Sequence, residues 1–177
     1  MDRVQRDQLD YGFTLIEVIL YIGIFSLIIG GIVSLAFLST AARSQNQTRA
    51  DLNYQGQAVM ASITQSIKNA TAVTAPTPGN SGSSLSLNIA DPLVDPTLFT
   101  IHSYAGYDAL QIHEGSPATT NDLTNSRVSI SHLTFTNMSV GTTSGSILIK
   151  FDLTYNNPLN RREFDNTQSF NGGATVP

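Results

Sequence analysis

The chain of 177 residues contains no cysteine, and charged residues make up only 12% of it. The absence of cysteine excludes disulfide bonds, thiol catalysis and zinc sites with cysteine ligands. Charged residues usually account for about 25% of a globular protein, so polar uncharged side chains take their place here. The formal net charge of −4 also argues against a surface that binds nucleic acid through its phosphates.

Charge is absent altogether from one long segment. The 21 residues from Val18 to Leu38 include no Asp, Glu, Lys, Arg or His, and about 20 apolar residues are enough for a helix to cross a bilayer. Glu17 lies directly before this segment, where a carboxylate costs about 2.5 to 3.5 kcal/mol on insertion scales. Because Glu17 lacks a partner in its own apolar segment, we expect it to have a functional partner elsewhere. The alternative is a carboxylate in the headgroup region, where it favours the start of a helix.

A secretory signal peptide is another interpretation of the apolar run, because Ser39-Thr40-Ala41 resembles a cleavage site made of small residues. Signal peptides usually have about 7 to 15 apolar residues after a basic segment. Here the run is longer, and the leader before it holds two arginines against three aspartates. A signal peptide also leaves Glu17 unexplained, and a plain membrane anchor is a further alternative.

The string Gly12-Phe13-Thr14-Leu15-Ile16-Glu17, followed by the apolar run, resembles the signature of type IV prepilins and pseudopilins. This resemblance implies that a prepilin peptidase cuts after Gly12 and methylates Phe13 as the new N-terminus. Glu17 would then face the α-amino group of a neighbouring Phe13, or stay close to its own, and so place subunits in register. The implied partners are the prepilin peptidase, other pilin or pseudopilin subunits, an inner-membrane assembly platform and the lipid bilayer, with no nucleic acid.

The same resemblance implies a location, and the chain departs from the family pattern in two ways. The precursor would cross the cytoplasmic (inner) membrane once with its C-terminal head outside, and then enter an extracytoplasmic pilus or pseudopilus. Family leaders are more often rich in Lys and Arg than this acidic one. Major pilins often carry a proline in the membrane helix, which is missing here. The Gly30-Gly31 pair either weakens the helix in the same way or allows close packing with another helix.

The helix is expected to continue well beyond the apolar run, because no proline occurs before Pro76. Apolar residues recur at steps of seven, four and four along one helical face, at Leu52, Val59, Ile63 and Ile67. We therefore predict a helix from Phe13 to about Lys68. The predicted parts are a leader (1–12), a membrane or filament-core half of the helix (13–38), an amphipathic half (39–73) and a β-rich head (74–177).

The head shows the alternation that is typical of strands. The clearest case is a run of five inward positions: Ile147, Ile149, Phe151, Leu153 and Tyr155. The alternation changes parity between Arg127 and Thr136, which predicts a bulge near Ser131-His132 or a bend. The segment 74–84 is expected to be a loop and the tail 168–177 to be poorly ordered. The fold class is therefore α+β and pilin-like, with a long hydrophobic helix packed on a C-terminal antiparallel sheet.

The order of elements from residue 98 to 155 is also similar to the minor pseudopilin J and minor pilin W group. The resemblance is carried by the strand 103–114, by Leu123-Thr124-Asn125 and by Leu133-Thr134-Phe135. It implies a minor pilin or pseudopilin of a type IV pilus or type II secretion-like filament. The alternatives are a major pilin, a tip adhesin or a DNA-uptake minor pilin. Exposed aromatic residues would favour a binding role, and the only indications of such a cluster are Tyr104, Tyr107 and Tyr155.

Candidate residues for catalysis or metal binding are few. The histidines are His102, His113 and His132, on three different predicted strands, and no Gly-x-Ser-x-Gly motif occurs. Three aspartates offer oxygen ligands for calcium, but Asp-Pro steps form turns equally well; these residues are Asp91, Asp95 and Asp108. The basic pair at 161–162 lies next to an acid, which favours a solvated strand edge. We expect the protein to have no enzymatic activity, no cofactor and no metal site.

Overall fold

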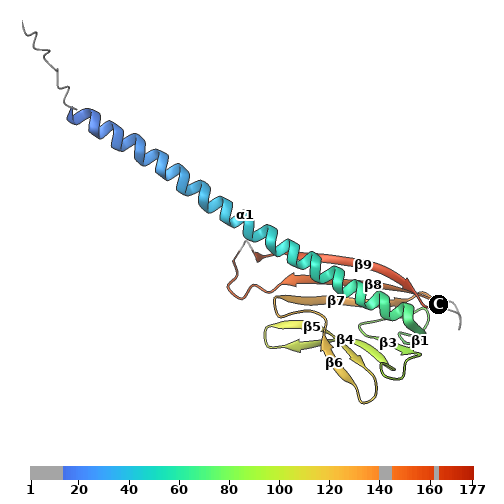
Figure 1. The fold of residues 1–177 in the computed structure, drawn as a ribbon. Helices are drawn as coiled ribbons and strands as arrows, with labels where there is room; N and C mark the ends of the chain where they lie inside the picture. The colour runs from blue at the N-terminus through green and yellow to red at the C-terminus, as the bar shows by residue number, and fades with distance from the viewer. Residues whose placement is uncertain (1–13, 140–144, 162–163) are drawn as a thin grey trace, which may run out of the picture. The chain divides into compact units, whose positions relative to one another are not determined.

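The computed structural model describes residues 14–139, 145–161 and 164–177, in which one α-helix precedes nine β-strands (Figure 1). The fold is α+β, with a long N-terminal helix and antiparallel sheets. Gly12 and Phe13, the predicted processing residues, lie outside the described residues. The chain divides into two compact units, Met1–Ala42 and Arg43–Pro177.

Helix α1 spans Leu15–Asn69 and ends within one residue of its predicted end. Thr14 caps its start, because the Glu17 backbone N–H lies 3.1 Å from the Thr14 carbonyl oxygen and 3.3 Å from the Thr14 hydroxyl oxygen. The helix continues without a break through Gly30-Gly31. Its apolar first part is long and hydrophobic enough to cross a membrane.

Nine strands form two antiparallel sheets. The first sheet has the order β1-β3-β4-β5-β6, and its strands are β1 (Ala70–Ala75), β3 (Leu85–Ile89), β4 (Thr97–Tyr104), β5 (Tyr107–Glu114) and β6 (Thr119–Asp122). The second has the order β2-β7-β8-β9, and its strands are β2 (Ser81–Gly82), β7 (Val128–Asn137), β8 (Ser146–Tyr155) and β9 (Thr167–Thr175).

The head has one core, shared by α1 and both sheets. The four helical residues predicted to share a face are all buried, at 1% exposure or less: Leu52, Val59, Ile63 and Ile67. The largest fully buried side chains of the same core are phenylalanines from β4, β7 and β8: Phe99, Phe135 and Phe151. The Asp108 N–H of β5 donates to the Ser129 hydroxyl of β7 at 2.9 Å, which joins the two sheets.

The bulge predicted in β7 is confirmed. The register between β7 and β8 shifts between Ser131 and Thr134, and His132 has a positive φ of 51°. The shift lets Ile130 and Phe135 both point into the core although their separation is odd.

The prediction of a poorly ordered tail was wrong. Thr167–Thr175 forms β9, which pairs with β8 along its whole length, and Ala174 and Val176 are buried. The predicted loop 74–84 also includes β2 and the end of β1.

Candidate functional site

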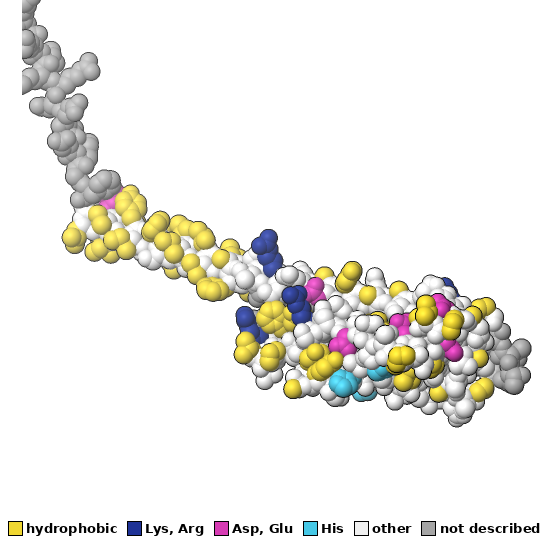
Figure 2. Space-filling model, turned by 60° about the horizontal axis from the view of Figure 1, so that its bottom comes forward, with side chains coloured by type: hydrophobic (Ala, Val, Ile, Leu, Met, Phe, Trp, Pro, Cys, Tyr) yellow, Lys and Arg dark blue, Asp and Glu magenta, His cyan; other side chains and the backbone are white. Residues whose placement is uncertain are grey.

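The first part of α1 presents an almost continuous apolar surface. From Thr14 to Thr40, every side chain is exposed except that of Glu17, which is partly buried. Figure 2 shows hydrophobic side chains covering this stretch of the helix. A contiguous exposed apolar surface of this kind marks a site of contact with a membrane or another protein. An α-helix suits both, because it satisfies its backbone hydrogen bonds internally.

Glu17 has a hydrogen-bonding partner that was not predicted. The Tyr21 hydroxyl, one helical turn further along, donates to Glu17 Oε1 at 3.1 Å. The expectation that Glu17 lacks a partner in its own apolar segment was therefore wrong. The spacing of four residues could have revealed it, since residues at i and i+4 are neighbours on a helix. Tyr21 leaves no charge pattern in the sequence, because a phenol is neutral.

Small residues interrupt the apolar surface at three glycines, Gly23, Gly30 and Gly31. A Cβ atom added at any of them would meet no atom within 4 Å. These positions therefore have no packing role within the described chain, and both readings of the Gly30-Gly31 pair remain open.

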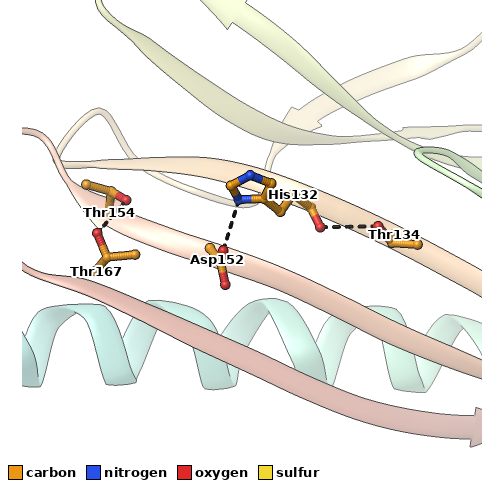
Figure 3. Close-up of polar contacts among 5 residues, drawn as sticks. All are labelled: His132, Thr134, Asp152, Thr154 and Thr167. Carbon is orange, nitrogen blue, oxygen red and sulfur yellow. Dashed lines mark hydrogen bonds and ion pairs between the residues drawn. The ribbon is translucent and has the colours of Figure 1, made fainter.

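The three histidines lie apart on β4, β5 and β7. His113 Nδ1 lies 2.8 Å from the Thr120 hydroxyl oxygen, and His102 packs edge-on against Tyr104 at 4.6 Å between ring centroids. His132 Nδ1 lies 3.0 Å from Asp152 Oδ2 on the exposed side of the second sheet (Figure 3). Each ring has a different neighbour, so the histidines do not form a common site.

The aspartates considered as calcium ligands act on the backbone instead. Asp91 Oδ1 accepts from the Leu93 N–H at 2.9 Å, and Asp95 Oδ1 accepts from the Ile89 N–H at 2.9 Å. Asp108 lies on β5, away from this turn. Among the residues that the structure describes, no group of three or more His, Asp or Glu side chains could hold a metal ion.

Tyr104 and Tyr107 come together at the tip of the β4–β5 hairpin, with stacked rings 5.0 Å apart. The Tyr104 hydroxyl donates to Asp122 at 3.0 Å, and Gln111 Nε2 donates both to Tyr104 and to Asp122. The hydrogen bond to Asp122 raises the pKa of Tyr104 above its ordinary value. These polar groups satisfy one another, so the network ties edge strand β6 to the sheet. Tyr155 is not part of the cluster and stacks on Phe164.

Two clefts of the head are polar. One, of about 360 Å³, is lined by Ser129, Thr154, Tyr155, Asn156, Asn157, Asn160 and Asp165. Its lining contains no histidine to serve as a general base for the serine. The other, of about 340 Å³, lies between α1 and the start of β9, where Arg49 Nε donates to Asn166 Oδ1 at 3.3 Å. The second arginine of the pair at 161–162 and the acid after it lie outside the described residues.

The chain was compared with protein-family models, with curated proteins and with solved structures, and none of the three comparisons found a match.

Proposed function

We propose that the chain is a structural subunit of a type IV pilus or type II secretion-like filament, specifically a minor pilin or pseudopilin. The observation that carries the proposal is the string Gly12-Phe13-Thr14-Leu15-Ile16-Glu17 placed directly before an exposed apolar helix. The same helix continues as the packed helix of a β-rich head, which supports a pilin-like layout.

The apolar surface of α1 needs two successive environments in this proposal. The precursor places residues 18–38 in the bilayer, because about 20 apolar residues span its hydrocarbon core. The filament then replaces lipid with the helices of neighbouring subunits. Both environments are apolar, so the exchange does not expose the helix to water.

Processing supplies a charged partner for Glu17. Hydrolysis of the Gly12–Phe13 peptide bond creates a charged α-amino group at Phe13, which is then methylated. An ammonium group beside the carboxylate offsets part of the cost of burying either charge. The pair forms between neighbouring subunits and so fixes how far one helix is shifted along the next.

The processing step predicts the N-terminus of the mature chain. When the full chain is produced together with a prepilin peptidase, mass spectrometry should find a methylated Phe13 at the N-terminus. A Gly12→Ala variant should be cut more slowly, since a side chain at this position would crowd the extended backbone in the peptidase cleft. A mature chain that begins at Ala42 or Arg43 would instead identify a secretory signal peptide and contradict the proposal.

The pairing predicts the effect of Glu17→Ala. This variant should be cut and methylated like the original chain, but it should enter filaments poorly because the α-amino group loses its partner. Ser26→Ala is a matched control, since the Ser26 hydroxyl donates to the Ile22 carbonyl of its own helix. Immunoblots of sheared filaments and of membranes give the incorporated fraction. Equal incorporation of Glu17→Ala and the original chain would rule out the pairing.

Minor status is the finer part of the proposal. It is supported by the similarity of residues 98–155 to the J and W group and by the lack of proline in the membrane helix. Quantitative mass spectrometry of purified filaments should find this subunit at a small fraction of the main one. A chain that makes up most of the filament would be a major pilin.

A further inference from the structure

We propose that Tyr21 is a positioning residue for Glu17: the Tyr21 hydroxyl donates to the carboxylate and so holds it in place for an ammonium group of a neighbouring subunit. This inference rests on the proposed filament function.

The position of Tyr21 fits the direction in which helical side chains lean. Side chains of an α-helix tilt toward its N-terminus, so a long side chain at position i+4 reaches back over position i. The Tyr21 hydroxyl accordingly lies 3.1 Å from Glu17 Oε1. A tyrosine four residues before Glu17 would lean away from it.

The hydrogen bond to Tyr21 takes the place of the contact that a capping box would make. Thr14 and Glu17 have the spacing of a capping box, in which the glutamate reaches back toward the first residues of the helix. The side-chain bond that the structure records for Glu17 runs to Tyr21 instead.

The bond leaves Glu17 able to bind an ammonium group. A carboxylate has about four acceptor positions on its two oxygens, and the phenol uses one of them on Oε1. A hydroxyl that donates to a charged oxygen forms a stronger bond than one between neutral groups. Tyr21 therefore lowers the cost of the unpaired carboxylate in the membrane while Oε2 stays available.

The next hydroxyl group along the apolar run, that of Ser26, does not compete for this role. Ser26 donates to the Ile22 carbonyl at 2.8 Å, within its own helix. Glu17 is also the one side chain between Thr14 and Thr40 that is partly buried, which agrees with a ring lying against it.

The first experiment measures incorporation of Tyr21→Phe, which removes only the hydroxyl. The incorporated fraction should fall about tenfold, the size expected for a hydrogen bond to a charged group, while cleavage and methylation stay normal. Tyr54→Phe is the matched control, because Tyr54 lies on the same helix and is 75% exposed. In a Glu17→Ala background, Tyr21→Phe should cause no further loss, since the two residues act as a pair.

The second experiment observes the carboxylate directly, in the full-length precursor in phosphatidylglycerol–phosphatidylethanolamine vesicles. With ¹³C-labelled glutamate, the infrared carboxylate band that disappears in Glu17→Gln belongs to Glu17. This band should shift in Tyr21→Phe and stay in place in Tyr54→Phe. A purely structural role of the ring would leave it unchanged.

The outcomes separate this inference from the proposed function. If Glu17→Ala assembles poorly but Tyr21→Phe assembles normally, the positioning role is wrong and the filament function stands. An equal loss from Tyr21→Phe with and without Glu17 would also overturn the positioning role. If Glu17→Ala assembles normally, the pairing of Glu17 with a neighbouring α-amino group is ruled out, and so is the role of Tyr21 in it.

Discussion

His132 occupies a left-handed backbone conformation at the bulge of β7, with a φ of 51°. Residues with a Cβ atom rarely adopt this conformation, and β-branched residues do so least. The side chain is 82% exposed and bonds to Asp152, while the His132 backbone carbonyl accepts from the Thr134 hydroxyl. The histidine is thus held by the backbone geometry of the bulge more than by its contacts.

This geometry predicts different changes in the free energy of unfolding for two substitutions. His132→Gly should change the free energy of unfolding by less than about 1 kcal/mol, because relief of backbone strain offsets the loss of an exposed bond to Asp152. His132→Val should destabilise the head by about 1 to 2 kcal/mol. Urea denaturation followed by circular dichroism measures both. A valine variant as stable as the glycine one would contradict the assigned conformation.

Tyr104 predicts a dependence of stability on high pH. Its pKa is raised chiefly by the hydrogen bond that it donates to Asp122, and the negative charge of Asp122 adds to the effect. A raised pKa in the folded state means that the stabilisation is complete below the ordinary value of 10.0 and is lost as the pH rises through the folded value. The stability difference between the original chain and Tyr104→Phe should therefore shrink above pH 10. A constant difference would show that the bond to Asp122 is absent.

At this scale the sequence predicted Glu17 as the notable residue and the bulge at His132. It did not predict Tyr21 or the network of Tyr104 with Gln111 and Asp122. Both rest on hydrogen bonds of neutral side chains, which leave no charge pattern in a sequence. The second also depends on strand register, which places Gln111 opposite Asp122.

The contact between α1 and β9 is unusually close for a helix and a strand. A Cβ atom at Gly56 would overlap the ring of Phe170, and one at Gly172 would lie 2.9 Å from Met60 Sδ. Gln168 Nε2 also donates to Asn53 Oδ1 at 2.7 Å. Glycine on each element lets the other approach.

Gly56→Ala should therefore destabilise the head by about 1 to 3 kcal/mol, as overpacking does. Alanine favours a helix by about 1 kcal/mol over glycine, so the sign of the change tests the contact. The Phe170 ring cannot move freely, because it stacks on Phe151 at 5.2 Å. Gly172→Ala is the comparison and should cost less, since the end of the Met60 side chain is flexible. A more stable Gly56→Ala variant would contradict the packing.

The buried stripe of α1 gives a second prediction at this scale. Ile63 is completely buried, so Ile63→Asp should destabilise the head by more than about 3 kcal/mol. Ala61→Asp is the control, since Ala61 is exposed on the same helix. The midpoint of thermal unfolding should drop for Ile63→Asp alone. Equal midpoints for Ile63→Asp and Ala61→Asp would show that the stripe does not contribute to the core.

Elements with a strong apolar period were predicted, and those without one were missed. Helix α1 and strand β8 have clear periods, because they bury large apolar side chains. The positions of β9 that contact α1 are Gln168, Phe170 and Gly172, so this face of the strand mixes a polar, an aromatic and a small residue and has no regular apolar period. Strand β6 reads Thr-Thr-Asn-Asp and is exposed throughout. Neither strand carries the pattern on which a sequence prediction depends.

The two units of the chain need different solvents, which predicts how they behave apart. Residues 15–38 expose apolar side chains, whereas Arg43–Pro177 has its own core. A chain that begins at Arg43 should dissolve without detergent, remain monomeric in sedimentation and keep the β-rich circular dichroism of the head. The full chain should require detergent or lipid. A chain from Arg43 that aggregates would show that the head depends on the first part of α1.

The division of the head into two sheets was not predicted, because strand order depends on contacts between distant segments. Strand β2 pairs with β7, and four other strands lie between them in the sequence. Alternation shows which side of a strand is buried but not which strand lies beside it. The α+β class followed from the sequence, whereas the arrangement of the strands did not.

The pairing of α1 with β9 also has a consequence for synthesis. Asn53 and its partner Gln168 are 115 residues apart. At about 5 to 20 residues per second, the ribosome needs roughly 6 to 23 seconds to make the intervening chain. During that time the stripe from Leu52 to Ile67 lacks the strand that closes over it. The apolar stripe on the head half of α1 is therefore exposed during synthesis, and it can associate with other chains until β9 has been made.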